Sequence, residues 1–255
     1  LLYLPVSLRQ GVHIKYMDAL FVSVSGICVT GLSTVNIGAT FSWFGQFVLL
    51  LLIQMGGLGI VTFTTLVFVA FQKRITLADR MLMQSAYNLD TLSGLVGMTL
   101  RIVRATISIE LIGTLLYAIV FVPQYGAAGI WYALFHAVSA FCNAGIDLLG
   151  GNSLCAYRDN IWINLTTMFL IVAGGLGFPV YWELARCFHI RRKKKTGESR
   201  MSFHARLVIV VTVILFAAGT LLTLILEYDN PQTLGNLPFP QKLLASMFQS
   251  VTLRT

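Results

Sequence analysis

Two short bends in this sequence carry the groups best placed to do chemistry, and each ends in a glycine. Residues 28–31 read Cys-Val-Thr-Gly and residues 142–145 read Cys-Asn-Ala-Gly, both between strongly apolar runs. A bare monovalent cation in hydrocarbon is penalised by on the order of tens of kcal/mol, and a ring of backbone carbonyls can replace its water. Glycine allows the unusual backbone angles that turn carbonyls toward one axis. Gly31 and Gly145 meet that requirement.

The bends belong to longer segments that align with each other. Residues 19–32 align without gaps on residues 133–146, and residues 53–59 align on residues 171–177. A shorter match joins residues 248–252 to residues 135–139 and to residues 21–25. A segment repeated at this length is one structural module. We therefore predict parallel repeats of span, half-helix, bend and span, arranged about an axis along the membrane normal.

The composition places these repeats in a membrane. Apolar residues make up 56% of the chain, charged residues 11%, and the mean hydropathy is +0.78. We predict an all-α integral membrane protein whose half-helices form re-entrant loops. Its net charge of +8 comes mainly from two basic stretches, which the positive-inside rule places in the cytoplasm.

A basic chain can also bind nucleic acid, but the basic run at residues 191–195 directly follows an apolar helix. We expect this run to set the topology and to contact anionic lipids, and we expect no nucleic-acid partner. The four cysteines have no spacing typical of a metal site.

Residues 16–27 and 130–141 are too short to cross about 30 Å of hydrocarbon at about 1.5 Å per residue, so both are predicted half-helices. Full spans are expected at residues 44–71, 95–122, 161–189 with a kink at Pro179, and 206–227; a third half-helix is expected at 241–251, an amphipathic cytoplasmic helix at 76–87, and the tail of a further span at 1–4. The predicted domains are 1–71 (first repeat, with the start of its first span missing), 72–94 (cytoplasmic amphipathic linker), 95–189 (second repeat), 190–205 (basic cytoplasmic linker) and 206–255 (third repeat, truncated at its bend).

Four motifs span the chain: Cys28-Val29-Thr30-Gly31-Leu32, Gln54-x-Gly56-Gly57-x-Gly59, Ser202-x-His204-x-Arg206 and Gln249-Ser250-Val251-Thr252-x-Arg254-Thr255. Together they resemble the Trk/Ktr/HKT superfamily of potassium transporters, and the Ktr-type membrane subunit is the nearest match. The resemblance implies four pseudo-tetrameric M1-pore-M2 repeats, each with a filter glycine. It also implies a homodimer in the bacterial plasma membrane and a cytosolic nucleotide-binding regulatory subunit of the RCK/KTN type. Two complete units cannot enclose a pore alone, so we expect the remaining repeats to lie outside this chain.

The implied substrate is potassium, bound by filter carbonyls, with no organic cofactor. The predicted filter residues are Cys28, Val29, Thr30, Gly31, Asn143, Ala144, Gly145 and Thr255. Thr255 corresponds to Val29 and Asn143 in the register of the family, although the gapless helix alignment places it at Cys142. The second bend departs from Val-Thr-Gly, which suggests an asymmetric filter with looser selectivity.

Other residues have two readings each. Asp147, two residues after Gly145, is a candidate for attracting cations to the outer mouth, or else a solvated loop carboxylate. The glycines Gly56, Gly57, Gly59, Gly174, Gly175 and Gly177 suit close helix packing, with a flexible gate as the alternative. Glu110 lies inside a predicted span, where an ionisable group is a functional candidate; the alternative, which we expect, is a structural pair with a basic residue of another helix.

Two other classes of function fit the sequence less well. A membrane hydrolase needs a nucleophile paired with a base or two facing carboxylates, and the spans show neither at matching depths; the chain is therefore predicted not to be an enzyme. A scaffold would not need repeated glycine bends. Sodium-coupled transport, or a non-selective or sodium channel of the same fold, stays open.

Overall fold

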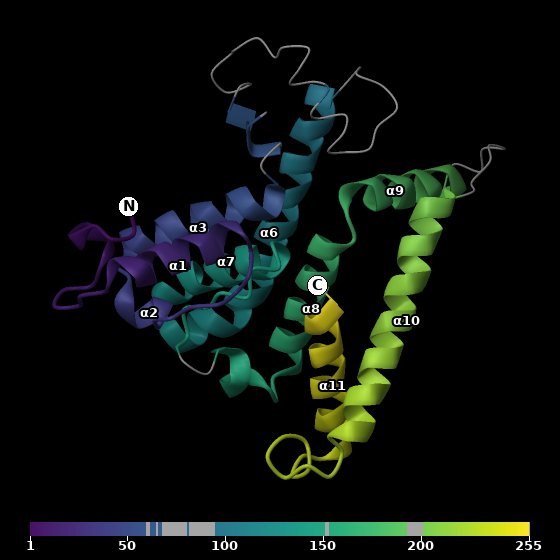
Figure 1. Cartoon of the computed structure of the whole chain (residues 1–255). Helices are drawn as coiled ribbons and strands as arrows, with labels where there is room; N and C mark the ends of the chain where they lie inside the picture. The colour runs from purple at the N-terminus through teal and green to yellow at the C-terminus, as the bar shows by residue number, and fades with distance from the viewer. Residues whose placement is uncertain are drawn as a thin grey trace. The chain divides into compact units, whose positions relative to one another are not determined.

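The computed structural model describes residues 1–59, 62–64, 66–67, 81, 95–150, 153–192 and 201–254. In these residues the chain is helical, and its one β interaction is an isolated bridge between Leu8 and Phe41. The chain divides into two compact units, residues 1–153 and residues 154–255. Figure 1 traces the helices of each unit along the chain.

The first unit contains the 3-10 turn η1 (Pro5–Ser7) and the helices α1 (Tyr16–Ile27), α2 (Ile37–Thr40), α3 (Trp43–Leu58), α6 (Leu95–Tyr125) and α7 (Ala128–Phe141). Side-chain caps fix two helix starts, as short polar residues at the N-cap commonly do. Asn36 accepts the N–H of Ala39 at 3.1 Å, and Ser42 accepts the N–H of Gly45 at 3.3 Å.

Close helix contacts hold this unit together. Helix α6 packs along α7, where the ring centroids of Phe121 on α6 and His136 on α7 lie 5.3 Å apart. Within α6, the ring of Phe121 also stacks on that of Tyr117, with centroids 5.5 Å apart. Helix α1 packs on α3 through Gly26, where an added Cβ would lie 2.8 Å from Leu49. These contacts hold the short helices α1 and α7 against longer helices.

The second unit contains α8 (Ile161–Gly175), α9 (Phe178–Arg192), α10 (Phe203–Leu226) and α11 (Phe239–Arg254), preceded by the 3-10 turn η2 (Ser153–Tyr157) at the unit boundary. Helix α11 lies along α10, and Ser250 donates a hydrogen bond of 2.9 Å to the Phe216 carbonyl. The carboxylate of Glu183 accepts the N–H and the hydroxyl of Ser202, at 2.9 and 2.7 Å. This contact joins α9 to the start of α10.

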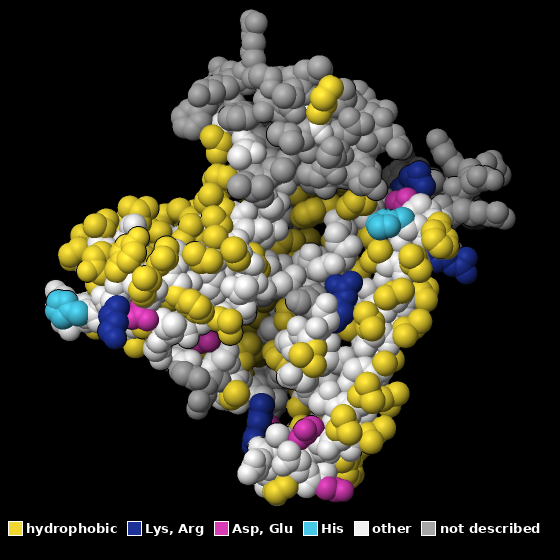
Figure 2. Space-filling view, in the orientation of Figure 1, with side chains coloured by type: hydrophobic (Ala, Val, Ile, Leu, Met, Phe, Trp, Pro, Cys, Tyr) yellow, Lys and Arg dark blue, Asp and Glu magenta, His cyan; other side chains and the backbone are white. Residues whose placement is uncertain are grey.

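Two described helices are long and apolar enough to cross a membrane, residues 97–125 and Phe203–Leu226. Helices α8 and α9 qualify together, but they meet at an angle of 99°. Only 6% of the most apolar 18-residue stretch of α10 is buried. Figure 2 shows hydrophobic side chains along this helix. Such a surface suits contact with lipid or with other apolar helices.

Several predicted helices are confirmed. Helix α1 has the predicted bounds, whereas α6 and α7 start or end two to three residues beyond their predicted limits, and α10 and α11 start earlier than expected. Helix ends are the least predictable part of an element, because end residues bond on one side only.

Three predictions were wrong. Residues 1–4 form turns before η1 rather than the tail of a helix. The span predicted at 44–71 is interrupted, since α3 ends at Leu58 and Gly59 takes a left-handed φ of 78°. The span at 161–189 breaks at Gly177, with φ of 83°, rather than kinking at Pro179, which lies in the first turn of α9. The helix predicted at 76–87, apart from residue 81, and half of the basic linker, residues 193–200, lie outside the described residues.

Candidate functional site

The two glycine bends close the short helices α1 and α7 with the same hydrogen bonds. In each, three successive N–H groups donate back to carbonyls of the last helical turn. The first set is Cys28 to Val24 (2.8 Å), Val29 to Gly26 (3.4 Å) and Thr30 to Ser25 (3.0 Å); the second is Cys142 to Val138 (2.9 Å), Asn143 to Ala140 (3.2 Å) and Ala144 to Ser139 (2.8 Å). The aligned segments therefore share a local backbone arrangement as well as a sequence pattern.

Backbone φ alternates in sign along both bends. Val29 and Gly31 have φ of 56° and 77°, Asn143 and Gly145 have φ of 59° and 65°, and the residue between each pair keeps a negative φ. A β-branched residue such as Val29 rarely adopts a positive φ, and the strain is worth roughly 1–3 kcal/mol. Strain of this kind is concentrated at functional sites.

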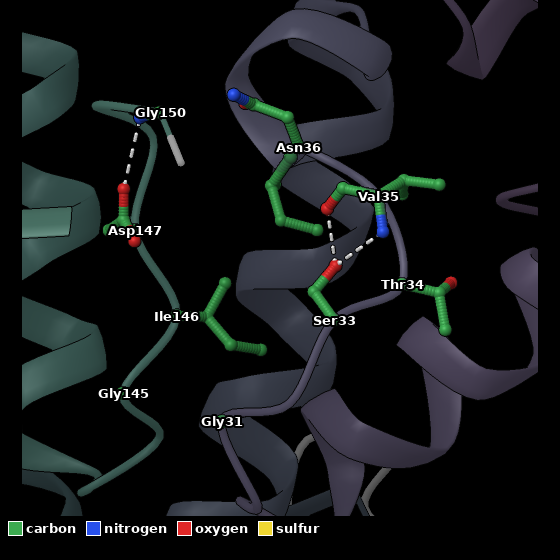
Figure 3. Close-up of a pocket in the computed structure, with 10 residues that line it drawn as sticks. Gly31, Ser33, Thr34, Val35, Asn36, Gly145, Ile146, Asp147 and Gly150 are labelled. Atoms are coloured by element: carbon green, nitrogen blue, oxygen red, sulfur yellow. Dashed lines mark hydrogen bonds between the residues drawn. The ribbon is translucent and has the colours of Figure 1, made fainter. Parts of the chain in front are cut away.

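The bends lie against each other (Figure 3). A Cβ added at Gly31 would lie 2.7 Å from the Ala144 carbonyl oxygen and 3.5 Å from the Cα of Gly145. Above them is a cavity of about 320 Å³, lined by both glycines and by residues that follow them, namely Ser33 to Ile37 after the first bend and Ile146, Asp147 and Gly150 after the second. The two bends thus form the floor of one shared cavity.

Asp147 lines this cavity, but part of its carboxylate is engaged. One of its oxygens, Oδ1, accepts the N–H groups of Leu149 and Gly150 at 2.8 and 3.2 Å. Asp147 is half-buried and lines the cavity, and its bonded oxygen shapes the turn that follows. Both readings made from the sequence are therefore compatible with its position.

Two serines that the sequence analysis did not select support the bends. The hydroxyl of Ser139 donates to the Ile146 carbonyl at 2.6 Å and accepts the N–H of Ile146 at 3.0 Å. Ser25 accepts a hydrogen bond of 3.1 Å from the Thr30 hydroxyl. The two serines occupy aligned positions, and this repetition was the signal that could have identified them.

The glycine motifs differ in what they contact. Gly56 leaves no room for a Cβ beside the Ile27 carbonyl, and Gly57 leaves none beside the Cys142 sulfur. Gly59 and Gly177, which occupy aligned positions, end their helices with left-handed φ and have open or ordinary surroundings. The remaining motif glycines, Gly174 and Gly175, form the last turn of α8. Gly56 and Gly57 therefore allow close packing, whereas Gly59 and Gly177 end helices.

Glu110 lies directly behind the second bend. It is 6% exposed, and the side-chain amide of Gln54 donates a hydrogen bond to its carboxyl group. The Cys142 sulfur lies 4.0 Å from Oε1 of Glu110 and 4.0 Å from Oε1 of Gln54. The expected basic partner is not found among the described residues; Glu110 instead joins α3, α6 and the end of α7.

The remaining candidates are placed less completely. Cys28 is exposed, in contrast to the buried Cys142. Thr255 lies outside the described residues. Within the described part of the chain, no three or more His, Cys, Asp or Glu residues lie close enough together to hold a metal ion.

The geometry and composition define a helical membrane protein with paired glycine bends. Its sequence matches the TrkH family model, described as a cation transport protein, over residues 3–255, and the chain belongs to this family.

Three relatives illustrate the relationship. The chain is 43% identical over its full length to Ktr system potassium uptake protein B of Bacillus subtilis (strain 168), of which it covers 55%. It is 40% identical to potassium/sodium uptake protein NtpJ of Enterococcus hirae and 35% identical to Ktr system potassium uptake protein B of Vibrio alginolyticus, in both cases over its full length and 54% of the relative. The chain thus spans about half the length of the relatives it matches.

Proposed function

We propose that this chain belongs to a bacterial plasma-membrane transporter that moves potassium, and that it has no enzymatic activity. The pathway is a filter of backbone carbonyls, formed in part by residues 28–31 and 142–145. The observation that carries this proposal is the pair of bends with alternating φ, whose glycines meet at the floor of one cavity.

The chemistry follows from the backbone. Alternation in the sign of φ turns successive carbonyls toward the same side, unlike the opposite directions found along a strand. Each half-helix also directs the negative end of its dipole at its bend. A dehydrated cation there meets oxygen atoms and a favourable potential together, which is what a filter needs to replace water.

The proposal includes the repeat organisation. The half-helices α1 and α7 enter from the outside and return through their bends, and α11 is the half-helix of a third repeat whose filter includes Thr255. Identical hydrogen bonding in the first two bends supports this arrangement. The domains are 1–71, 95–189 and 206–255 as repeats, with 72–94 and 190–205 as cytoplasmic linkers.

Partners are proposed on the same basis. The family resemblance supports a homodimer and a cytosolic nucleotide-binding subunit. The two basic linkers are the surface on which we expect that subunit to dock. The basic residues of 191–195 also suit anionic lipid headgroups.

The proposal includes sodium as a second ion because the two bends differ in sequence. The first carries Val29 and Thr30, whereas the second carries Asn143 and Ala144, so the oxygens around the ion are not equivalent. One relative bears the name of a potassium/sodium uptake protein. Sodium is therefore the competing or coupled ion.

The full-length gene should restore growth at low potassium to a bacterial host lacking potassium uptake. Uptake should be measured with and without external sodium, which separates coupling from competition. A full-length protein that reaches the membrane without moving potassium or sodium would contradict the proposal.

A further inference from the structure

Arg254 joins three helices at the end of α11. Its guanidinium donates to the Gly175 carbonyl at 3.1 Å through Nη1 and to the Thr212 hydroxyl at 2.8 Å through Nη2. Gly175 ends α8, and Thr212 lies buried in the middle of α10. A single side chain thus holds the last turn of α11 against both neighbours.

The bond to Gly175 occurs where α8 is broken. The last carbonyls of a helix have no partner within it, and the chain turns by 99° between α8 and α9. Two of these carbonyls are taken by side chains, since Tyr181 donates its hydroxyl to Ala173 and Arg254 donates to Gly175. Arg254 therefore links the break in α8 to the end of α11.

The second bend shows a matching contact of a different kind. With Thr255 aligned on Asn143, Arg254 corresponds to Cys142, and the glycine motifs align Gly175 on Gly57. Gly57 packs on the Cys142 sulfur, whereas Gly175 receives a hydrogen bond from Arg254. The same pair of positions is thus joined by packing at one bend and by a charged donor at the other.

The guanidinium acts here through its shape. Its two acceptors, the Gly175 carbonyl and the Thr212 hydroxyl, are neutral oxygen atoms. For comparison, Arg158 forms an exposed ion pair with Asp159 at 3.4 Å. A planar fork can reach two acceptors on different helices, while an ammonium is a single point on a flexible stem. Replacement by lysine therefore keeps the charge but not the two-way link.

We propose that Arg254 is a positioning residue that sets the third filter segment by tying the end of α11 to the broken end of α8 and to α10. This inference rests on the proposed function. It implies that ion preference depends on the fork.

The test compares four variants of the full-length transporter: Arg254→Met, Arg254→Lys, Thr212→Val and, as the control, Arg158→Met on the exposed pair. Uptake of potassium and its preference over sodium are measured per molecule in the membrane. Loss of one hydrogen bond in Thr212→Val should change the preference by about threefold to tenfold. Arg254→Met should change it more, Arg254→Lys should fail to restore it, and Arg158→Met should match the unmodified protein.

A double-mutant cycle separates positioning from general stability. If the fork acts as one unit, the effects of Arg254→Lys and Thr212→Val on ion preference should be non-additive. The inference is overturned if both variants keep the normal rate and preference, or if Arg254→Met lowers only the amount of protein. Absence of transport by the unmodified protein would instead contradict the proposed function.

Discussion

Gly31 and Gly145 occupy aligned positions with similar left-handed backbones but different surroundings. A Cβ at Gly31 would lie 2.7 Å from the Ala144 carbonyl, whereas at Gly145 the nearest atom would be 3.7 Å away. Both substitutions carry the backbone penalty of a side chain in the left-handed region, roughly 1–2 kcal/mol. Only Gly31→Ala must also displace a carbonyl of the facing bend. We therefore expect Gly31→Ala to reduce potassium uptake and ion preference more than Gly145→Ala.

Gly126 provides a matched control for this comparison. Its φ is +60° and no atom lies within 4 Å of an added Cβ. Gly126→Ala thus carries the backbone penalty without a neighbour to displace, and its transport per molecule should be nearly normal. Equal losses in all three variants would show that backbone strain, rather than the contact between the bends, determines the effect.

Glu110 is expected to act through the groups that it contacts. Glu110→Ala leaves the Gln54 amide without its acceptor, a loss of about 1–3 kcal/mol in the free energy of unfolding for a buried polar group. Glu110→Gln keeps an acceptor oxygen and should be milder. Thermal unfolding of the purified full-length protein checks this order. If the two variants were equally destabilised, the negative charge itself would be required.

The contact between α3 and the second bend gives a test at the level of helices. Gly57→Ala inserts a methyl group against Cys142 and should lower the free energy of unfolding by about 1–3 kcal/mol, as overpacking does. Replacing Cys142 with alanine in the same protein should recover part of this loss, because it removes the displaced sulfur. Unfolding by denaturant measures both changes. Additive losses in the double variant would mean that the two residues do not press on each other.

Sequence pattern predicted the helices better than their interruptions. The apolar run of residues 16–27 and its polar ends predicted the bounds of α1 correctly, because the length of an apolar run and its flanking residues determine where a short helix begins and ends. A glycine inside an apolar run, however, can either pack or end a helix, and only φ separates the two. At α8 a signal was present: Gly177 followed by Pro179 is a typical helix end and restart. The alignment placed both bends, but contacts between distant residues, such as Gly57 with Cys142, could not be deduced from it.

The chain as a whole is proposed to contribute two complete filter segments and the start of a third. The alignment of these segments supports one membrane orientation for all repeats, with both basic linkers in the cytoplasm. Single cysteines at Gln84 and Glu198 of a cysteine-free full-length variant should resist an impermeant reagent added outside intact cells. A cysteine at Asn236, in the loop between α10 and α11, should react and serves as the control. Efficient labelling at Gln84 or Glu198 would overturn this topology.

The most direct test of the account is to locate the ion in the full-length protein. Thallium mimics potassium and scatters anomalously, so crystals grown with it would show each bound ion as a separate peak. We predict a peak within coordinating distance of the carbonyls of residues 29–31 and 143–145, and its loss when sodium replaces thallium. Bound thallium found only elsewhere, with these carbonyls uncoordinated, would contradict the assignment of the two bends as the filter.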